Sequence, residues 1–158
     1  MIKIIACGKL KEKWMKEGIA EYVKRIRPYD KIEVIEVPDE KAPETNSAAE
    51  NEQVKIVEGQ RLLKNVRDDE YLILLDLAGQ DIDSVALANK IQDCYNHARS
   101  KITFVIGGSL GLSSELIARA DFRWRISKAT FPHQICRILV VEQIYRSFRI
   151  LHNEPYHK

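Results

Sequence analysis

Two short, almost entirely apolar segments constrain the fold of this chain more than any other feature. Residues 71–75 read Tyr-Leu-Ile-Leu-Leu, and residues 102–106 read Ile-Thr-Phe-Val-Ile and end at a pair of glycines. Such segments are typical of strands that are covered on both faces, as in parallel sheets whose crossover helices pack on either side. The chain is therefore predicted to form a parallel sheet between two layers of helices.

Helical patterns alternate with the strand patterns along the whole chain. Apolar residues that recur every three or four positions indicate helices, and Ser84 and Pro132 are suited to a helix N-cap and a first helical turn. Five alternations of strand and helix predict a single α/β domain over residues 1–158, with a mostly parallel sheet flanked by helices. The predicted strands are 2–7, 31–37, 71–75, 102–106 and 122–126, and the predicted helices are 15–26, 47–66, 84–99, 113–120 and 132–151.

Composition limits the classes of protein that this chain can belong to. Its 158 residues are 45% hydrophobic and 30% charged, which is ordinary for a globular domain. No apolar segment approaches the ~20 residues that cross a bilayer, and the N-terminus lacks the pattern of a signal peptide. We therefore expect a cytoplasmic protein without membrane contact. The cysteines (Cys7, Cys94 and Cys136) and the four histidines lack metal-ligand spacing, so no metal is expected and the cysteines are interpreted as buried apolar residues.

Charge is unevenly distributed although the net charge is only +2. Residues 1–31 hold nine basic and four acidic side chains, residues 38–70 hold five and nine, and residues 119–158 hold eight and three. Basic segments of this kind favour a polyanionic partner such as a nucleic acid. The alternative is that they are ordinary solvated surfaces.

Several glycines directly follow predicted strands, where open α/β sheets bind their ligands. Glycine lets the backbone turn sharply and approach a ligand, although each position taken alone is equally consistent with a plain tight turn. The chain has no dinucleotide-binding glycine motif, no Walker loop and no nucleophile elbow. The residues thus favour a ligand that is held by backbone groups and apolar contacts, without specifying which. The glycines are Gly8, Gly79, Gly107, Gly108 and Gly111.

The last predicted helix carries a broad apolar face and three arginines. The apolar face is expected to pack on the sheet. It either packs on a second subunit as well or is buried in the core of its own chain alone. Arg137, Arg146 and Arg149 are expected on the remaining surface, followed by a tail that contains Tyr156. Arginines and an aromatic ring beside a glycine-lined cleft suit RNA, through phosphate contacts and base stacking.

Four motifs together resemble those of the SPOUT RNA methyltransferases, in particular the small pseudouridine N3-methyltransferases of bacterial ribosomes. The resemblance covers essentially the whole chain, including the opening Gly8-Lys9-Leu10-Lys11-Glu12 and the segment Pro38-Asp39-Glu40-Lys41-Ala42-Pro43. The motifs are Phe104-Val105-Ile106-Gly107-Gly108, Lys128-Ala129-Thr130-Phe131-Pro132-His133, Glu142-Gln143-Ile144-Tyr145-Arg146 and Pro155-Tyr156-His157.

This resemblance implies more than the residue patterns do. It implies a C-terminal trefoil knot over about residues 71–158, although knots are otherwise rare, and a homodimer with the knot region and last helix at its interface. It implies S-adenosylmethionine as the methyl donor and 23S ribosomal RNA within the ribosome as the substrate, with no DNA partner. By position, the cofactor would be held by three loops, which contain Leu75, Gly79, Gly107, Gly108, Ser127, Lys128, Ala129, Thr130, Phe131 and Pro132.

The resemblance implies direct displacement, in which N3 of the base loses its proton and attacks the methyl group. The catalytic candidates are His157 as proton acceptor, Arg146 as electrostatic stabiliser and Tyr156 as a stacking or hydrogen-bonding contact. Alternatively, Arg146 only binds phosphate and the tail only orders on RNA. His133 is interpreted as a helix N-terminal or interface residue. Contacts to the RNA backbone are expected from Lys9, Lys11, Lys13, Arg25 and Arg27, unless these form a plain solvated surface.

Three other functions remain open at this point. The first is a non-catalytic ribosome-binding factor that has a SPOUT-like fold. The second is a flavodoxin-like domain that binds a nucleotide or flavin. The third is a SPOUT enzyme with a different RNA target, such as a transfer RNA ribose, for which the chain lacks an RNA-binding extension.

Overall fold

The computed structural model describes residues 1–42, 44 and 47–158 and confirms the α/β class. Pro43, which belongs to one of the motifs above, lies outside the described residues. All pairings within the five-stranded sheet are parallel. The strands are β1 (Ile2–Cys7), β2 (Ile32–Val37), β3 (Tyr71–Asp81), β4 (Ile102–Ile106) and β5 (Phe122–Arg125), and the helices are α1 (Lys13–Ile26), α2 (Ala48–Leu63), α3 (Ser84–Asn96), α4 (Ser114–Arg119) and α5 (His133–Leu151).

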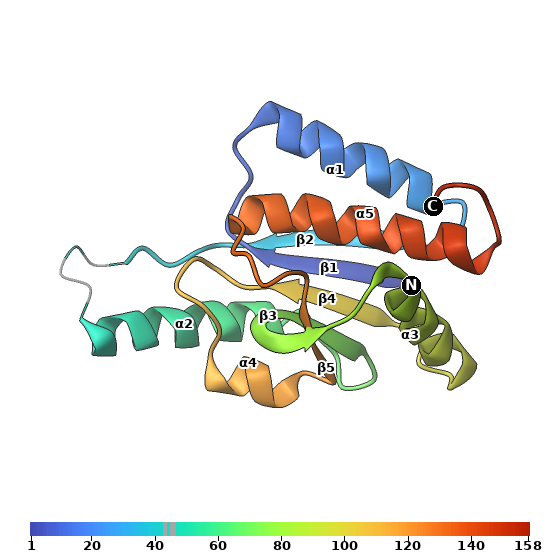
Figure 1. Ribbon diagram of the computed structural model, residues 1–158. Helices are drawn as coiled ribbons and strands as arrows, with labels where there is room; N and C mark the ends of the chain where they lie inside the picture. The colour runs from blue at the N-terminus through green and yellow to red at the C-terminus, as the bar shows by residue number, and fades with distance from the viewer. Residues whose placement is uncertain (43, 45–46) are drawn as a thin grey trace.

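The helices form two layers, one on each face of the sheet (Figure 1). Apolar side chains of α1, α3 and α5 pack in one cluster with one face of the strands, while those of α2 and α4 pack with the other face. Successive side chains of a strand point to opposite faces, so an apolar strand contributes to both clusters. This is why the central strands carry nearly unbroken apolar sequences.

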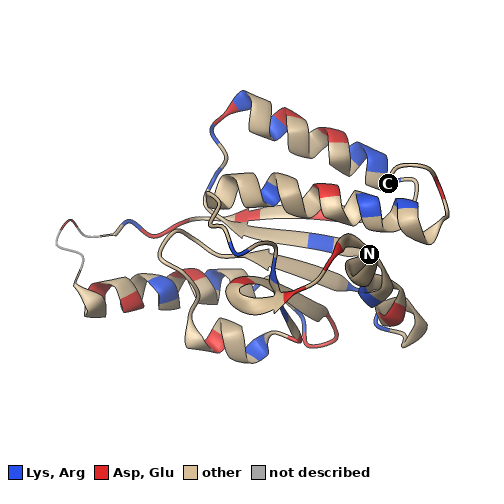
Figure 2. Cartoon of the chain, viewed as in Figure 1, with Lys and Arg blue, Asp and Glu red and all other residues tan. Residues whose placement is uncertain are grey.

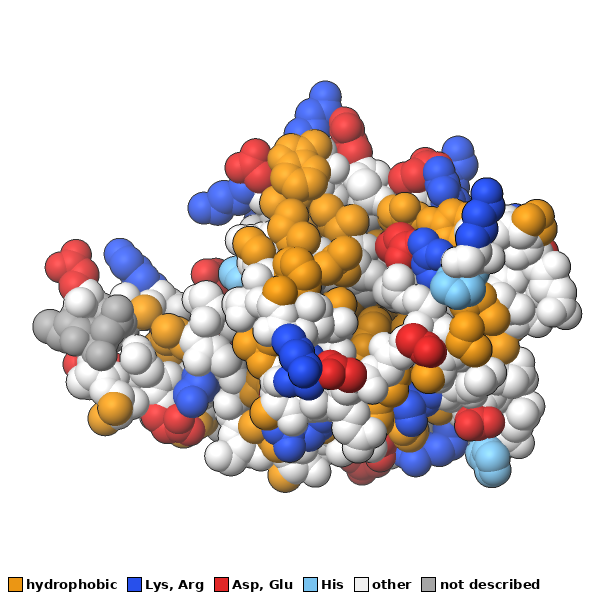
Figure 3. All heavy atoms as spheres, viewed as in Figure 1, with side chains coloured by type: hydrophobic (Ala, Val, Ile, Leu, Met, Phe, Trp, Pro, Cys, Tyr) orange, Lys and Arg blue, Asp and Glu red, His pale blue; other side chains and the backbone are white. Residues whose placement is uncertain are grey.

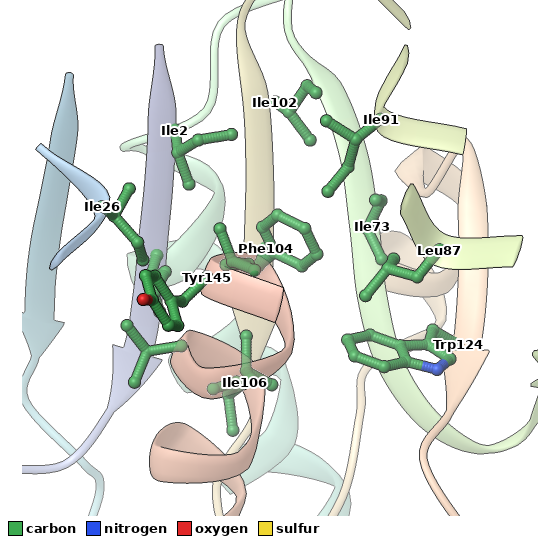
Figure 4. Close-up of a cluster of buried hydrophobic side chains, with 14 of the residues drawn as sticks. Ile2, Ile26, Ile73, Leu87, Ile91, Ile102, Phe104, Ile106, Trp124 and Tyr145 are labelled. Atoms are coloured by element: carbon green, nitrogen blue, oxygen red, sulfur yellow. The ribbon is translucent and has the colours of Figure 1, made fainter. Parts of the chain in front are cut away.

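The larger core cluster is centred on Phe104 of β4, which is fully buried. Its ring packs against Trp124 from β5 in a T-shaped arrangement with a centroid distance of 6.3 Å, and Figure 4 shows Ile73 and Leu87 beside the two rings. Burial of each such side chain stabilises the fold by roughly 2 kcal/mol. Trp124 therefore links the core to the end of β5, from which a ligand-facing loop departs.

The strand order β2-β1-β4-β3-β5 differs from that of a flavodoxin-like domain. Flavodoxin-like sheets have the order 2-1-3-4-5, so the third and fourth strands are exchanged here. This order removes the main support for the flavodoxin-like alternative. The trefoil knot stays a prediction, because strand order does not define how the chain is threaded.

Three predicted boundaries were wrong at the ends of elements. Strand β3 does not stop at Leu75: it bulges outward and pairs again with β5 through Gln80 and Asp81. The N-cap of α3 is Asp83, whose side chain accepts a hydrogen bond from Ala86 N at 2.8 Å. Pro132 is the N-cap of α5 and not part of its first turn. Apolar patterns do not report such polar pairings, so they locate elements better than their ends.

Arg137 was expected on the surface of the last helix and is instead buried, with an exposed fraction of 2%. Its guanidinium group donates hydrogen bonds to the carbonyl oxygens of Cys7 and Gly8, each at 2.7 Å, and it pairs with Glu36 at 2.7 Å. Buried carbonyl groups at the end of a strand need hydrogen-bond donors, and Arg137 supplies them to these two. Arg137 thus ties the start of α5 to the end of β1.

Among the described residues, no helix is both long enough and apolar enough to span a bilayer.

Candidate active site

A cavity of about 700 Å³ opens at the carboxyl ends of β3, β4 and β5. Its walls come from the bulge of β3, the glycine-rich loop after β4, and the segment that connects β5 to α5. Apolar side chains dominate the walls, among them Leu75, Ile106, Trp124 and Ile126. Parallel α/β sheets bind ligands at this edge, and the volume suits a ligand of the size of a nucleoside derivative.

Eight of the ten predicted cofactor residues line this one cavity, which draws together three loops that lie far apart in sequence. Gly79 and Lys128 do not line it. Gly79 lies in the β3 bulge, where an added Cβ would be only 2.5 Å from the carbonyl oxygen of Arg123, so its glycine is required by close backbone contact. The side chain of Lys128 is exposed. The eight are Leu75, Gly107, Gly108, Ser127, Ala129, Thr130, Phe131 and Pro132.

Charged groups lie at the margin of the cavity in ion pairs. Asp76 accepts from Arg123 at 2.6 Å, and Asp81 accepts from Arg125 at 2.7 and 2.6 Å. These pairs join β3 to β5 and fix the bulge that forms one wall. In the described part of the chain, the buried Trp124 Nε1 has no hydrogen-bond partner.

The three predicted catalytic residues lie together in a second place, on α5 and the tail. Arg146 donates to Nδ1 of His157 at 3.1 Å, and its guanidinium carbon is 4.7 Å from the centroid of the Tyr156 ring. Glu142 joins them, because its Oε1 accepts from Arg146 at 2.8 Å and from the Tyr156 hydroxyl at 3.1 Å. We call these four residues the tail cluster.

Hydrogen bonding defines what the tail cluster can do as it stands. An arginine N–H can only donate, so Nδ1 of His157 is the acceptor in this hydrogen bond. His157 must therefore leave Arg146 before it can take a proton through Nδ1. Burial and hydrogen bonds to Tyr22 and Glu142 raise the pKa of Tyr156, so its hydroxyl stays protonated and acts as a donor.

The tail is held in place by contacts to α5 and to the turn that follows α1. Arg149 donates to the Pro155 carbonyl at 3.0 Å and pairs with Glu154, which also accepts from Tyr29 at 2.9 Å. The tail therefore has a fixed position on the protein itself.

Within one chain, the cavity and the tail cluster are far apart. Cys136 is the last residue of α5 that lines the cavity, and Arg146 follows ten positions later. At a rise of ~1.5 Å per residue, these positions are separated by about 15 Å along the helix. In the described part of the chain, no member of the tail cluster lines the cavity.

His133 is the first residue of α5 and lines the cavity, which agrees with its interpretation as a helix N-terminal residue. Burial and the nearby Arg137 lower its pKa, so it is neutral at pH 7. Neutral histidine can donate or accept a hydrogen bond without adding charge to the cavity.

Cys7 is expected to resist alkylation. Burial and a hydrogen bond to Glu58 raise its pKa from 9.0 to about 12, which lowers the thiolate fraction at pH 8 about a thousandfold. Mass spectrometry after treatment with iodoacetamide should find Cys7 unmodified in the folded protein and modified in 6 M guanidinium. Rapid modification of Cys7 in the folded state would contradict this environment.

Sequence reasoning missed several residues of these two sites. Glu142 was quoted only as part of a motif, although its spacing of four from Arg146 is the signal of a helical ion pair. Asp76, Leu77 and Ala78 line the cavity directly after Leu75; they lie within the first predicted cofactor loop but were not named as site residues. Arg123 gave no signal, because its partner lies 47 residues away in sequence.

Comparison with known proteins assigns the chain to a family. The family model described as "Predicted SPOUT methyltransferase" matches residues 1–157. The chain is 52% identical over 157 residues to the ribosomal RNA large subunit methyltransferase H of Alkaliphilus oremlandii, and 50% identical to that of Carboxydothermus hydrogenoformans, with 99% of each chain covered. A protein of Clostridium perfringens named ribosomal RNA large subunit methyltransferase H 1 is also 50% identical, at the same coverage. The chain belongs to the SPOUT methyltransferase family.

Proposed function

We propose that this protein transfers a methyl group from S-adenosylmethionine to N3 of a pseudouridine in 23S ribosomal RNA within the ribosome. The observation that carries the proposal is the single cavity formed by three separate loops that the family resemblance assigns to the cofactor. The relatives are named ribosomal RNA large subunit methyltransferases, and these names support large-subunit ribosomal RNA as the substrate class. The pseudouridine and its N3 atom come from the motif resemblance, as does the cytoplasm as the place of action.

The cavity fits S-adenosylmethionine in size and chemistry. Its volume of about 700 Å³ lies within the range that encloses small ligands and cofactors. Apolar walls suit the adenine ring, while the backbone of the loop at Gly107 and of residues 127–132 offers donors and acceptors. When bound, the cofactor supplies an electrophilic methyl group for direct displacement.

The tail cluster provides the groups that act on the base. Removal of the N3 proton leaves negative charge on the ring, which the guanidinium group of Arg146 stabilises. The hydroxyl of Tyr156, which donates its one proton to Glu142 in this structure, can donate it to a carbonyl oxygen of the base after it has left Glu142. His157 takes the proton only after it has left Arg146. The main contribution of the protein is to hold the base in line with the methyl group.

A homodimer resolves the separation of about 15 Å between the two sites. Figure 3 shows hydrophobic side chains gathered over α1 and the start of α5. They include Trp14, which is 56% exposed, and apolar residues of α5 remain half-buried beside it. An isologous contact through this apolar surface sets α5 of one subunit against the partner. In the proposed arrangement, the tail cluster of one subunit faces the cavity of the other.

Basic side chains at the start of the chain complete the proposed RNA surface. Lys9, Lys11 and Lys13 are exposed, and Figure 2 shows basic residues at both ends of α1 with acidic residues between them. Arg25 is paired with Glu21 and is less available for a phosphate group. A chain of this size has little separate RNA-binding surface, so we expect the folded ribosome to supply much of the specificity.

Mixed dimers test the shared active site. Arg146→Ala should lower kcat about tenfold to a hundredfold and leave the affinity for S-adenosylmethionine unchanged, because Arg146 is proposed to act on the base and not on the cofactor. A heterodimer of an Arg146→Ala subunit and an Ala129→Trp subunit, whose cavity is filled, should recover about half of the wild-type rate. If the heterodimer is as inactive as both homodimers, the two sites act within one chain.

Calorimetric titration with S-adenosylmethionine and S-adenosylhomocysteine tests the enzymatic function against the alternative of a non-catalytic ribosome-binding factor. The methyltransferase binds both ligands saturably. A folded protein that binds ribosomes but neither ligand, with or without ribosomes present, would fit the binding factor.

A further inference from the structure

The chain reverses its direction directly after α5, and this turn sets the course of the tail (Figure 1). Asn153 has a φ of 52°, which lies in the left-handed region that asparagine tolerates better than most residues. Asn153 N donates to the Ile150 carbonyl at 3.1 Å, and Glu154 N donates to the Arg149 carbonyl at 2.9 Å. Because of this turn, the tail runs back along α5 as far as Arg146.

Three side chains from separate elements hold the turn, and we call them the tail anchor. They are Tyr29 from the turn that follows α1, Arg149 of α5, and Glu154 of the turn itself. The Tyr29 hydroxyl donates to Glu154 Oε1 at 2.9 Å and accepts from Arg149 at 3.1 Å. Arg149 also pairs with Glu154 and donates to the Pro155 carbonyl at 3.0 Å. The three side chains thus bind one another and the backbone just before Tyr156.

The tail anchor is mounted on the core of the protein. The Tyr29 ring stacks on the Phe148 ring, with the centroids 5.4 Å apart and the planes 5° from parallel. Phe148 is buried, and the His152 ring packs against Tyr29 at a centroid distance of 4.9 Å. Burial raises the pKa of the Tyr29 hydroxyl, so this group stays protonated and remains a donor at neutral pH. The ring that carries the hydroxyl is therefore fixed by the protein alone.

The contacts of the tail anchor act locally and contribute little to the stability of the whole fold. The side chains of Arg149 and Glu154 are 21% and 37% exposed, and partly exposed ion pairs are weak because water competes with them. These contacts hold the turn and not the sheet. Their loss should therefore free the tail and leave the rest of the chain folded.

We propose that Tyr29, Arg149 and Glu154 are positioning residues for methyl transfer. They order the turn and keep the tail beside Arg146, so that binding of the base does not carry the entropic cost of ordering the tail. The side chain of His157 can still leave Arg146, because the anchor holds the backbone two residues earlier. This inference rests on the proposed function, in which the tail cluster acts on the base.

Hydrogen exchange tests the tail anchor without an assay of activity. Glu154→Ala removes the shared partner of Tyr29 and Arg149. The amides of residues 153–158 should exchange at least about tenfold faster in this variant, while those of the sheet keep their wild-type rates and the thermal midpoint moves by less than about 3 °C. Glu52→Ala breaks an ion pair of similar exposure on α2 and should leave exchange in the tail unchanged. Unchanged exchange in the tail of Glu154→Ala would overturn the inference, whether or not the protein methylates RNA.

Kinetic measurements on ribosomes test whether the ordered tail serves the reaction. Glu154→Ala should lower kcat about tenfold and keep the affinity for S-adenosylmethionine within twofold. Tyr29→Phe keeps the stacked ring but loses the hydroxyl, and it should lower kcat about threefold.

A chain that carries both Tyr156→Ala and His157→Ala shows whether the anchor acts only through the tail. Adding Glu154→Ala to this chain should not lower the residual single-turnover rate further. A further loss in this background, or full activity of Glu154→Ala in the otherwise wild-type chain, would overturn the inference. A wild-type protein that transfers no methyl group would instead contradict the proposed function.

Discussion

Ala129→Trp is expected to abolish cofactor binding while leaving the protein folded. Ala129 is exposed on the segment between β5 and α5 and lines the larger cavity. An indole at this position occupies the space that we assign to the cofactor. Calorimetry should show at least a hundredfold loss of affinity for S-adenosylmethionine, which corresponds to about 3 kcal/mol, and methyl transfer should fall in proportion.

The neighbouring residue provides a matched control for this substitution. Lys128 is exposed on the same segment but does not line the cavity. Lys128→Trp should therefore keep the affinity within about threefold, as expected for a change outside the binding site. Equal losses of affinity in both variants would show either that the cofactor binds elsewhere or that a tryptophan at any position disrupts this segment. Gly108→Trp is a poorer choice, because its side chain would be directed at Glu58 and not into the larger cavity.

Arg137→Met should lower the free energy of unfolding by about 3 kcal/mol, because it leaves buried partners unsatisfied. The substitution removes the donors to the carbonyl groups of Cys7 and Gly8 and the ion pair to Glu36. Methionine fills much of the volume but offers no donor. Urea unfolding at a fixed protein concentration measures the loss, since the proposed dimer would make stability depend on concentration.

Arg61→Met serves as the control for Arg137. Arg61 also pairs with a glutamate and a backbone carbonyl, Glu40 and Pro38, but its side chain is 32% exposed. Exposed ion pairs contribute little, so the loss should stay below about 1 kcal/mol. Similar losses of unfolding free energy in the two variants would show that the buried Arg137 contacts between α5 and β1 stabilise the fold no more than an exposed ion pair does.

The sequence was sufficient to predict the architecture because the strands are apolar on both faces and because apolar residues recur at helical spacing in the helices. Those patterns identified the α/β class and the edge of the sheet that forms the cavity. They could not predict the strand order or the return of β3 to β5 at Gln80, which depend on pairing between distant segments. The knot predicted from the resemblance is untested by the strand order.

The site was predicted less completely than the fold, and for different reasons. Glycines indicated two of the ligand-facing loops and the family resemblance supplied the loop at residues 127–132, but Gly79 proved to serve close packing against β5. Arg137 was misplaced because a helical pattern of charges does not reveal a buried arginine that binds distant carbonyl groups. The separation between Arg146 and the cavity could be seen only once α5 was in place. Glu58 carried no sequence signal, because nothing in a polar helix marks a carboxylate as buried.

Transfer of a labelled methyl group is the most direct test of the proposed function. Ribosomes from a strain without this methylation are incubated with the protein and labelled S-adenosylmethionine, and the 23S RNA is digested and analysed by nucleoside mass spectrometry. We predict one methyl group per ribosome, on N3 of a pseudouridine, with far less transfer to a naked RNA hairpin. Transfer to a ribose or to another base, or no transfer by a protein that binds the cofactor, would contradict the proposal.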